Sequence, residues 1–306
     1  MKNIQLRPRT VADIDAQVQK VLHGLGSPEP PIDLRLAREL LRLDREYYSS
    51  SDGGLLHQVV SRLKVAGAQV LKRPTILGDA IRKLSLKALY LPDEKRILLD
   101  EDLPQLKHRW NEAHEIGHDI IPWHAGMMLG DTEQTLTPAC HEQMEAEANY
   151  AAGQLLFLGP RFRAEALSTT PSLEVVRQLK KSYGNTLTST LWRFVEHAHV
   201  DVPMVGVISG HPHPSRRADD FDPANPCRYV IESGAFAQRF GRVTAVQLFR
   251  HIVGYCGPQR GGGIGASEVV LPDSNGSDHV FHFETFFNRY EALTLGVYQH
   301  PSTRMF

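Results

Sequence analysis

The stretch His114-Glu-Ile-Gly-His118 contains two histidines and one glutamate at a spacing that can do metal chemistry. Side chains four residues apart lie one above the other on a helix, so both imidazoles can bind a single metal ion. Glu115 then points to the side of the pair, where it can take a proton from a metal-bound water. The pattern predicts a zinc hydrolase centre; the alternative is a surface helix with two histidines and a solvated glutamate.

The residues around this motif are typical of a helix with one buried face. Apolar residues recur at helical spacing, and we expect this arc to face the core: Trp110, Ala113, Gly117, Ile120 and Ile121. The two histidines lie at the edge of the arc, where a metal ligand in a cleft should be. Pro122 is expected to end the helix.

A third ligand is expected from a second helix, at 142–156, for which Thr137-Pro138 would supply the cap and first turn. Glu145 can complete a site of two histidines and one glutamate and leave a fourth position open for water. Asn149 shares a side of this helix with Glu145, so it can hydrogen-bond a ligating histidine and fix its ring. Glu147 points away and is the weaker ligand candidate. The alternative for Glu145 is a solvated helix charge.

These motifs resemble those of the ImmA/IrrE metallopeptidases. The helix that ends in Ala-His-Glu-Ile-Gly-His118 precedes a loop, and the sequence Glu145-Ala-Glu-Ala-Asn149 follows it, with Leu155-Leu156 beyond. The run Lys87–Asp100 is similar to the hairpin that comes before the metal helix in that family. Two features depart from the family pattern: His124 lies farther from the motif than a histidine that such proteins often have, and the second helix has a longer ending.

The resemblance implies an activity, a cofactor and a partner. By position, His114, His118 and Glu145 are the Zn²⁺ ligands, and Glu115 is the general base. Proteins of this family commonly cleave a helix-turn-helix repressor, which relieves transcription in a stress response or a phage-defence operon. DNA, often single-stranded, is a candidate activator. We therefore expect a zinc endopeptidase with a protein substrate.

The composition excludes several other classes. A chain of 306 residues can form two or three domains, and its 42% hydrophobic and 23% charged content is ordinary for a globular protein. The net charge of −1 gives no overall positive field, so any nucleic-acid binding must use a local patch. Three cysteines argue against a disulfide framework. We find neither a signal-peptide core nor a membrane-spanning run, and we expect a cytoplasmic protein with no membrane partner.

We expect an α+β fold in three parts: a zincin-like metallopeptidase domain at 1–160, a helix-turn-helix-like segment at 161–200 and a C-terminal α/β regulatory domain at 201–306. In the first part the patterns predict helices at 11–25, from Pro30-Pro31 and at 55–66, a short strand at 69–72 and a hairpin at 84–99. The second of these helices should bury Leu34, Ala37, Leu40 and Leu41. A sheet edge beside the zinc could hold an extended peptide by strand addition.

The middle segment contains two helical patterns, at 172–183 and 185–197, separated by Gly184. The resembling family carries a helix-turn-helix at this place. Candidate nucleic-acid contacts are the basic residues Arg161, Arg163, Arg177, Lys180, Lys181 and Arg193. A purely structural helical linker that packs on the peptidase is the alternative, and it stays open.

The C-terminal part reads as short strands near 205–209, 228–232, 268–272 and 279–283, with a helix at 236–253. The family resemblance implies a GAF- or PAS-like sensor fold here. The glycine-rich run at 260–265 has no strand before it and no clear helix after it, so we interpret it as a flexible turn.

Cys140 precedes Glu145 by five residues, and a thiolate is a good zinc ligand. Cys140 is therefore a candidate inhibitory ligand for the open metal position. A buried free cysteine is the alternative that we favour.

Two other functions compete with the zinc endopeptidase. One is a non-catalytic regulator that binds DNA or a partner and uses zinc only structurally; the intact Glu115 argues against it, because a structural site has no use for a base. The other is an active peptidase that makes no contact with DNA.

Overall fold

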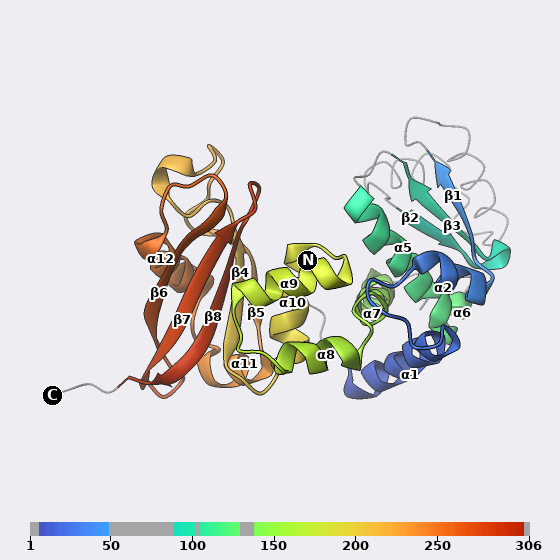
Figure 1. Cartoon of the computed structure of the whole chain (residues 1–306), viewed down its shortest axis with the longest axis horizontal. Helices are drawn as coiled ribbons and strands as arrows, with labels where there is room; N and C mark the ends of the chain where they lie inside the picture. Colours follow the sequence, from blue (N-terminus) through green and yellow to red (C-terminus); the bar gives the residue numbers. More distant parts are fainter. Residues whose placement is uncertain (1–5, 49–87, 102–104, 129–137, 303–306) are drawn as a thin grey trace. The chain divides into compact units, whose positions relative to one another are not determined.

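The computed structural model of the chain describes residues 6–48, 88–101, 105–128 and 138–302. The chain divides into two compact units, Met1–Gly159 and Pro160–Phe306. Each unit combines helices with a sheet (Figure 1), which confirms the expected α+β class. None of the described helices is long and apolar enough to cross a membrane. The helix expected at 55–66, the strand at 69–72 and Thr137 lie outside the described residues.

The first unit contains a three-stranded sheet and a set of helices. In the sheet, β3 lies between β1, which is parallel to it, and β2, which is antiparallel to it. The β2–β3 turn passes through Lys95 in the left-handed conformation, so the expected hairpin is confirmed over its described residues. In chain order the elements are α1 (Pro8–Gly24), α2 (Leu34–Leu41), β1 (Asp44–Tyr48), β2 (Ala88–Leu91), η2 (Pro92–Glu94), β3 (Arg96–Asp100), α5 (Gln105–Ile120), α6 (Pro122–Met128) and α7 (Pro138–Leu156).

Helix α2 differs from its prediction in both its start and its buried face. The side chain of Asp33 accepts a hydrogen bond from the Arg35 backbone, which caps the helix at Leu34 instead of at the two prolines. Leu34 and Ala37 are buried, but Leu41 is half-buried and Leu40 is 46% exposed. The predicted stripe is therefore wrong at Leu40, whose side chain lies against Gly24 of α1.

Two ion-paired carboxylates fix the rotation of α5 about its axis. Glu112 is buried and accepts hydrogen bonds from Arg38 of α2 at 2.6 Å and from Arg45 of β1 at 2.9 Å. Two turns later, Asp119 accepts one from Lys95 of the hairpin at 2.6 Å. Because seven residues bring a helix back to nearly the same side, both carboxylates anchor one side of α5 and leave another side for its histidines. Helix α5 ends at Ile120, just before Pro122 as expected, and Pro122 itself begins α6.

Helices α5 and α7 approach each other closely because small residues line their contact. Ala113, Ala148 and Ala151 are fully buried. A Cβ added to Gly117 would lie 2.8 Å from the backbone oxygen of Ala148 and 3.3 Å from the Cβ of Ala151. The glycine inside the histidine motif therefore lets the two backbones approach to a separation that an alanine would not permit.

The second unit is a five-stranded antiparallel sheet with helices on both faces. Its strand order is β5-β4-β8-β7-β6, and both α11 and α12 come between β5 and β6 in the chain. Numbered within the unit, the order is 2-1-5-4-3. The GAF- or PAS-like assignment of this unit stays a prediction. The elements are α8 (Pro160–Leu167), α9 (Leu173–Tyr183), α10 (Leu187–Arg193), the π-helical turn η3 (Phe194–Ala198), β4 (Met204–Ser209), η4 (Pro214–Arg216), β5 (Cys227–Glu232), α11 (Gly234–Phe240), α12 (Ala245–Tyr255), β6 (Gly262–Pro272), β7 (Asp278–Phe287) and β8 (Ala292–Pro301).

The core of this unit lies between the sheet and helices α11 and α12. It is rich in phenylalanine, and its fully buried members are Val205, Val207, Phe236, Phe240, Leu248, Ile252, Phe281 and Phe283. Since successive strand residues point to opposite faces, Gly206 faces the other side of β4, where a Cβ on it would contact Leu191 of α10. Helix α9 is held near β7 by the Glu284 carboxylate, which accepts a hydrogen bond from the Leu173 backbone at 2.7 Å.

Three sequence interpretations need correction here. The single helix expected at 236–253 is two, because Thr244 forms a capping box that starts α12 afresh. The glycine run, taken as a flexible turn, enters β6 at Gly262, with an irregularity in its pairing near Gly265. Strand β8, at the middle of the sheet, was not predicted; a glycine at 296 and threonine at 294 interrupt its apolar pattern.

The two short helices expected in the middle segment are present. Ser172 caps α9, Gly184 ends it in the left-handed conformation, and Thr186 caps α10. They belong to the same compact unit as the sheet. The division of the chain into three domains by function stays a prediction.

Replacing Gly117 with alanine tests the close approach of α5 and α7. Because the new Cβ would press on backbone, Gly117→Ala should destabilise the first unit by about 1–3 kcal/mol. Gly254→Ala is the matched control: Gly254 is also helical and has nothing within 4 Å of its Cβ position, so it should gain up to about 1 kcal/mol. Urea unfolding measures both, and equal stability of the two variants would contradict the contact.

Candidate metal centre

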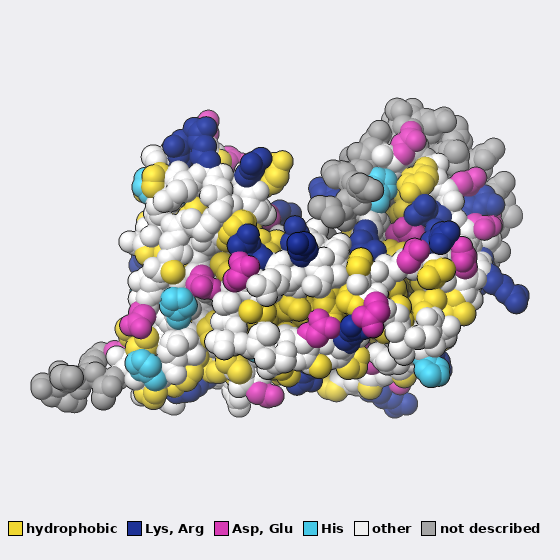
Figure 2. Space-filling model, viewed as in Figure 1, with side chains coloured by type: hydrophobic (Ala, Val, Ile, Leu, Met, Phe, Trp, Pro, Cys, Tyr) yellow, Lys and Arg dark blue, Asp and Glu magenta, His cyan; other side chains and the backbone are white. Residues whose placement is uncertain are grey.

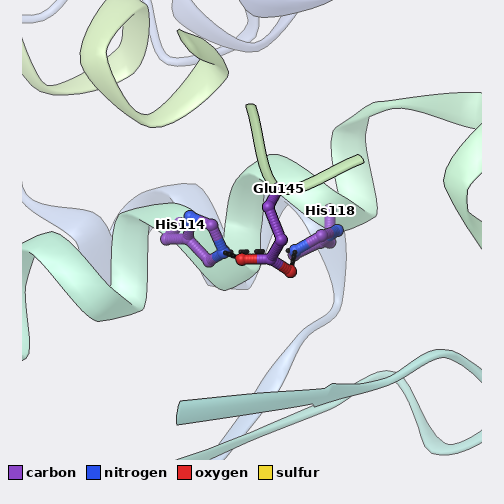
Figure 3. A group of neighbouring side chains, drawn as sticks. All are labelled: His114, His118 and Glu145. Carbon is purple, nitrogen blue, oxygen red and sulfur yellow. Dashed lines mark hydrogen bonds and ion pairs between the residues drawn. The ribbon is translucent and has the colours of Figure 1, made fainter. Parts of the chain in front are cut away.

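Helices α5 and α7 direct three side chains at one point (Figure 3). Nε2 of His114 lies 3.2 Å from Nε2 of His118 and 3.2 Å from a carboxylate oxygen of Glu145. Nε2 of His118 lies 3.5 Å from the other oxygen of that carboxylate. Within the described part of the chain, these residues form the group of His, Cys, Asp and Glu side chains that could hold a metal ion, with all ligand atoms within 4.8 Å.

These separations fit a zinc ion. Zinc binds imidazole nitrogen and carboxylate oxygen tetrahedrally at about 2.0–2.1 Å, so neighbouring ligand atoms should lie roughly 3.3 Å apart. The three measured separations lie close to that value. Two nitrogens and one oxygen are also the donor set of catalytic zinc sites, which keep a fourth position open. The residues present therefore fit the metal that the motif predicts.

Asn149 contacts the histidine that the sequence analysis proposed it could orient. Its side-chain oxygen lies 3.1 Å from Nδ1 of His114. Because that oxygen can only accept, His114 donates from Nδ1 and turns Nε2 toward Glu145. Residues 145 and 149 are one helical turn apart, so a single side of α7 supplies both contacts.

The other histidine has a partner that the sequence analysis missed. Nδ1 of His118 lies 3.0 Å from Nδ1 of His124, and Nε2 of His124 lies 2.9 Å from a carboxylate oxygen of Glu147. That carboxylate also accepts hydrogen bonds from Trp123 at 2.6 Å and from Gln143 at 2.8 Å. The signal was a histidine displaced from its family position, but only the turn into α6 places it between α5 and α7.

Glu115 lies in a drier environment than Glu145. It is 6% exposed and accepts a hydrogen bond from the backbone of Tyr90 in β2. Burial raises the pKa of Glu115 to about 7, against the nearby charge of His114, which lowers it. A carboxylate with a pKa near neutrality can both accept and return a proton at physiological pH.

Two of the three groups of the site, His118 and Glu145, are in states suited to metal binding. Burial lowers the pKa of His118 to about 4, so its imidazole is neutral at pH 7. Burial opposes ionisation of Glu145, but the imidazoles of His114 and His118 beside it hold its pKa well below the usual range. Burial also acts to lower the pKa of His114, yet Glu145, together with the charge of Glu115, leaves that pKa raised.

Cys140 is half-buried near the start of α7. Within the described residues it is not part of the group that could share an ion. Its role as an inhibitory ligand stays a prediction.

The structure contradicts one of the six predicted nucleic-acid contacts. Arg193 is 7% exposed, because α10 lies against β4 and β8, so it cannot reach a phosphate backbone. Arg177 pairs with Glu174 at 2.6 Å, and Arg161 pairs with Glu165 at 3.0 Å. Contacts by Arg161, Arg163, Arg177, Lys180 and Lys181 stay a prediction. On the face drawn in Figure 2, basic side chains are interspersed with acidic ones.

Residues 66–194 match the family model described as Peptidase_M78, IrrE N-terminal-like domain. Over these residues the chain is similar to the IrrE N-terminal-like domain. This confirms the resemblance drawn from the motifs, since the matched range contains the histidine motif, Glu145 and Asn149. The matching model describes a family of peptidases.

A solved structure of a Mycobacterium tuberculosis transcriptional regulator has a similar fold. The two chains are 13% identical, with a TM-score of 0.53, over 94% of this chain and 76% of the other. At this identity the likeness is one of fold alone. None of the curated proteins compared with the chain matches it.

Removing the charge of Glu145 should change the titration of His114 in the metal-free protein. Glu145 contributes to raising the pKa of His114 against burial, by contact and by charge, so Glu145→Gln should lower that pKa. Glu142→Gln, at an exposed position of the same helix, is the control and should leave it unchanged. NMR titration of the ring protons measures both; an unaltered His114 in Glu145→Gln would contradict the assigned interaction.

Proposed function

We propose that the chain is a zinc-dependent endopeptidase. The observation that supports this most is the meeting of three metal-binding side chains from α5 and α7 next to the buried carboxylate of Glu115. The peptidase family that matches residues 66–194 supports the same activity. A purely structural zinc site would have four protein ligands and no need for Glu115.

In the proposed mechanism, His114, His118 and Glu145 hold the zinc ion. Zinc held there would supply Lewis-acid chemistry: it would polarise the scissile carbonyl and lower the pKa of the attacking water. Glu115 accepts the proton of that water and then donates it to the leaving amine nitrogen. The hydrogen bond from the Tyr90 backbone keeps the Glu115 carboxylate directed at the same place in both steps.

Strand β2 is the element on which we propose that the substrate lies. Among the described strands it pairs with β3, and we propose that its other edge receives the substrate. The Tyr90 backbone contact places this strand beside Glu115. An extended peptide that adds to the edge would carry its carbonyl groups past the base.

We further propose that the substrate is a helix-turn-helix repressor in the cytoplasm. Its cleavage would relieve repression of a stress-response or phage-defence operon. The basis is the family resemblance, together with the fold shared with a transcriptional regulator. Single-stranded DNA is the proposed activating signal.

The general base can be tested by Glu115→Gln. The change removes proton transfer but none of the three metal ligands, so cleavage should fall by about 10²–10⁴-fold while zinc binding is retained. The substrate to use is a helix-turn-helix repressor encoded beside this gene, with fragments measured by mass spectrometry. Glu142→Gln is the control and should cleave normally; removing zinc with a chelator should also stop cleavage. Equal cleavage by Glu115→Gln and the unaltered protein would reject the mechanism.

A non-catalytic regulator is the second candidate. It is favoured by the fold shared with a transcriptional regulator over 94% of the chain. Binding of the repressor or of DNA with no cleavage under any stimulus would support it over the peptidase.

Contact with DNA can be tested by reversing charge at Lys180 and Lys181 on α9. Losing two phosphate contacts should weaken DNA binding and make it less dependent on salt, while cleavage without DNA stays unchanged. Lys20→Glu, on the exposed side of α1, is the control. Unchanged DNA binding by the Lys180→Glu, Lys181→Glu variant would leave an active peptidase that does not use α9 to bind DNA.

A further inference from the structure

A buried chain of hydrogen bonds extends from His118, the second of the two proposed metal-binding histidines of α5, to a carboxylate on another side of α7. It passes from His118 through His124 to Glu147. His124 is fully buried and Glu147 is 5% exposed. Neither His124 nor Glu147 is one of the three proposed metal ligands. Both side chains are nevertheless held by hydrogen bonds, Glu147 also by those from Trp123 and Gln143.

When both rings are neutral, donor and acceptor rules determine which nitrogen of each ring carries the proton. The Glu147 oxygen that faces His124 also accepts from Trp123, and a carboxylate can only accept, so His124 donates from Nε2. A neutral imidazole with its proton on Nε2 has a lone pair on Nδ1. His118 must then donate from its own Nδ1 to that lone pair, which leaves its Nε2 unprotonated. This is the nitrogen that faces His114 and Glu145.

Glu147 can contact His118 only through a second side chain, because of its position on α7. Glu147 is two residues from Glu145, so it points to another side of α7 and cannot contact the site directly. Helix α6 begins at Pro122, directly after α5, and places His124 between Glu147 and His118. The short turn after the motif thereby couples the two long helices.

We propose that His124 and Glu147 are positioning residues that select the zinc-binding tautomer of His118. The proposal rests on the proposed function, because it assigns His118 to the metal. Ligating histidines whose outer nitrogen is bonded to a carboxylate bind metal more tightly, since ring orientation and tautomer are set in advance. Here the carboxylate acts through a second imidazole.

Two substitutions of His124 separate hydrogen bonding from packing. Phenylalanine fills the ring's space but has no acceptor, so His124→Phe should weaken zinc binding by about 10- to 100-fold. The side-chain oxygen of asparagine can occupy the position of Nδ1, so His124→Asn should recover most of that loss. His141→Phe, at an exposed position of α7, is the matched control and should bind zinc normally. Chelator competition with the full chain measures all four proteins.

The order of affinities decides the proposal. Normal zinc binding by His124→Phe would overturn it, and so would an His124→Asn variant as weak as His124→Phe, because packing alone would then account for the effect. Cleavage by Glu115→Gln judges the proposed function separately, since that variant leaves the hydrogen-bond chain intact.

A second measurement applies even if His124→Phe does not fold. In the metal-free protein labelled with ¹⁵N-histidine, NMR should find His118 as a neutral ring protonated on Nδ1 and His124 protonated on Nε2. The opposite tautomer at either residue would overturn the proposal.

Discussion

The close contact between α5 and α7 is the constraint on which the site depends. Two ligands lie on one helix and the third on the other, so the three meet only if the backbones approach to the separation that Gly117 permits. Fully buried alanines on both helices maintain that separation. The ion pairs of Glu112 and Asp119 then set the rotation of α5, so that its histidines turn to α7 and not to the sheet.

Three carboxylates close to one another have different roles because their environments differ. Glu145 lies beside the imidazoles of His114 and His118, which keep its carboxylate ionised, as a metal ligand must be. Glu115 is buried beside β2 with a pKa of about 7, which suits a group that accepts and returns a proton. Glu147 accepts three N–H groups and faces no solvent or substrate, so it can serve only to hold its neighbours. All three residues are glutamates, so it is burial and hydrogen bonding that distinguish the proposed base Glu115 from the proposed ligand Glu145 and the proposed positioning residue Glu147.

The local parts of the site could be predicted from the sequence, and the parts that depend on tertiary contacts could not. Helical spacing alone places His118 one turn after His114 and Asn149 one turn after Glu145, and the structure brings these residues together. The link from His124 to Glu147 needs the turn into α6, which no periodicity encodes. Arg193 was expected on the surface because of its charge, yet α10 is covered by the sheet. Strand β8 escaped prediction because Thr294 and Gly296 interrupt its apolar run.

The most direct test of the account is anomalous X-ray scattering at the zinc absorption edge from crystals of the full chain grown with zinc. The account predicts one peak bonded to Nε2 of His114, Nε2 of His118 and the Glu145 carboxylate at about 2.0–2.2 Å, with solvent at the fourth position. A zinc ion bound elsewhere, or one closed off by four protein ligands, would contradict it.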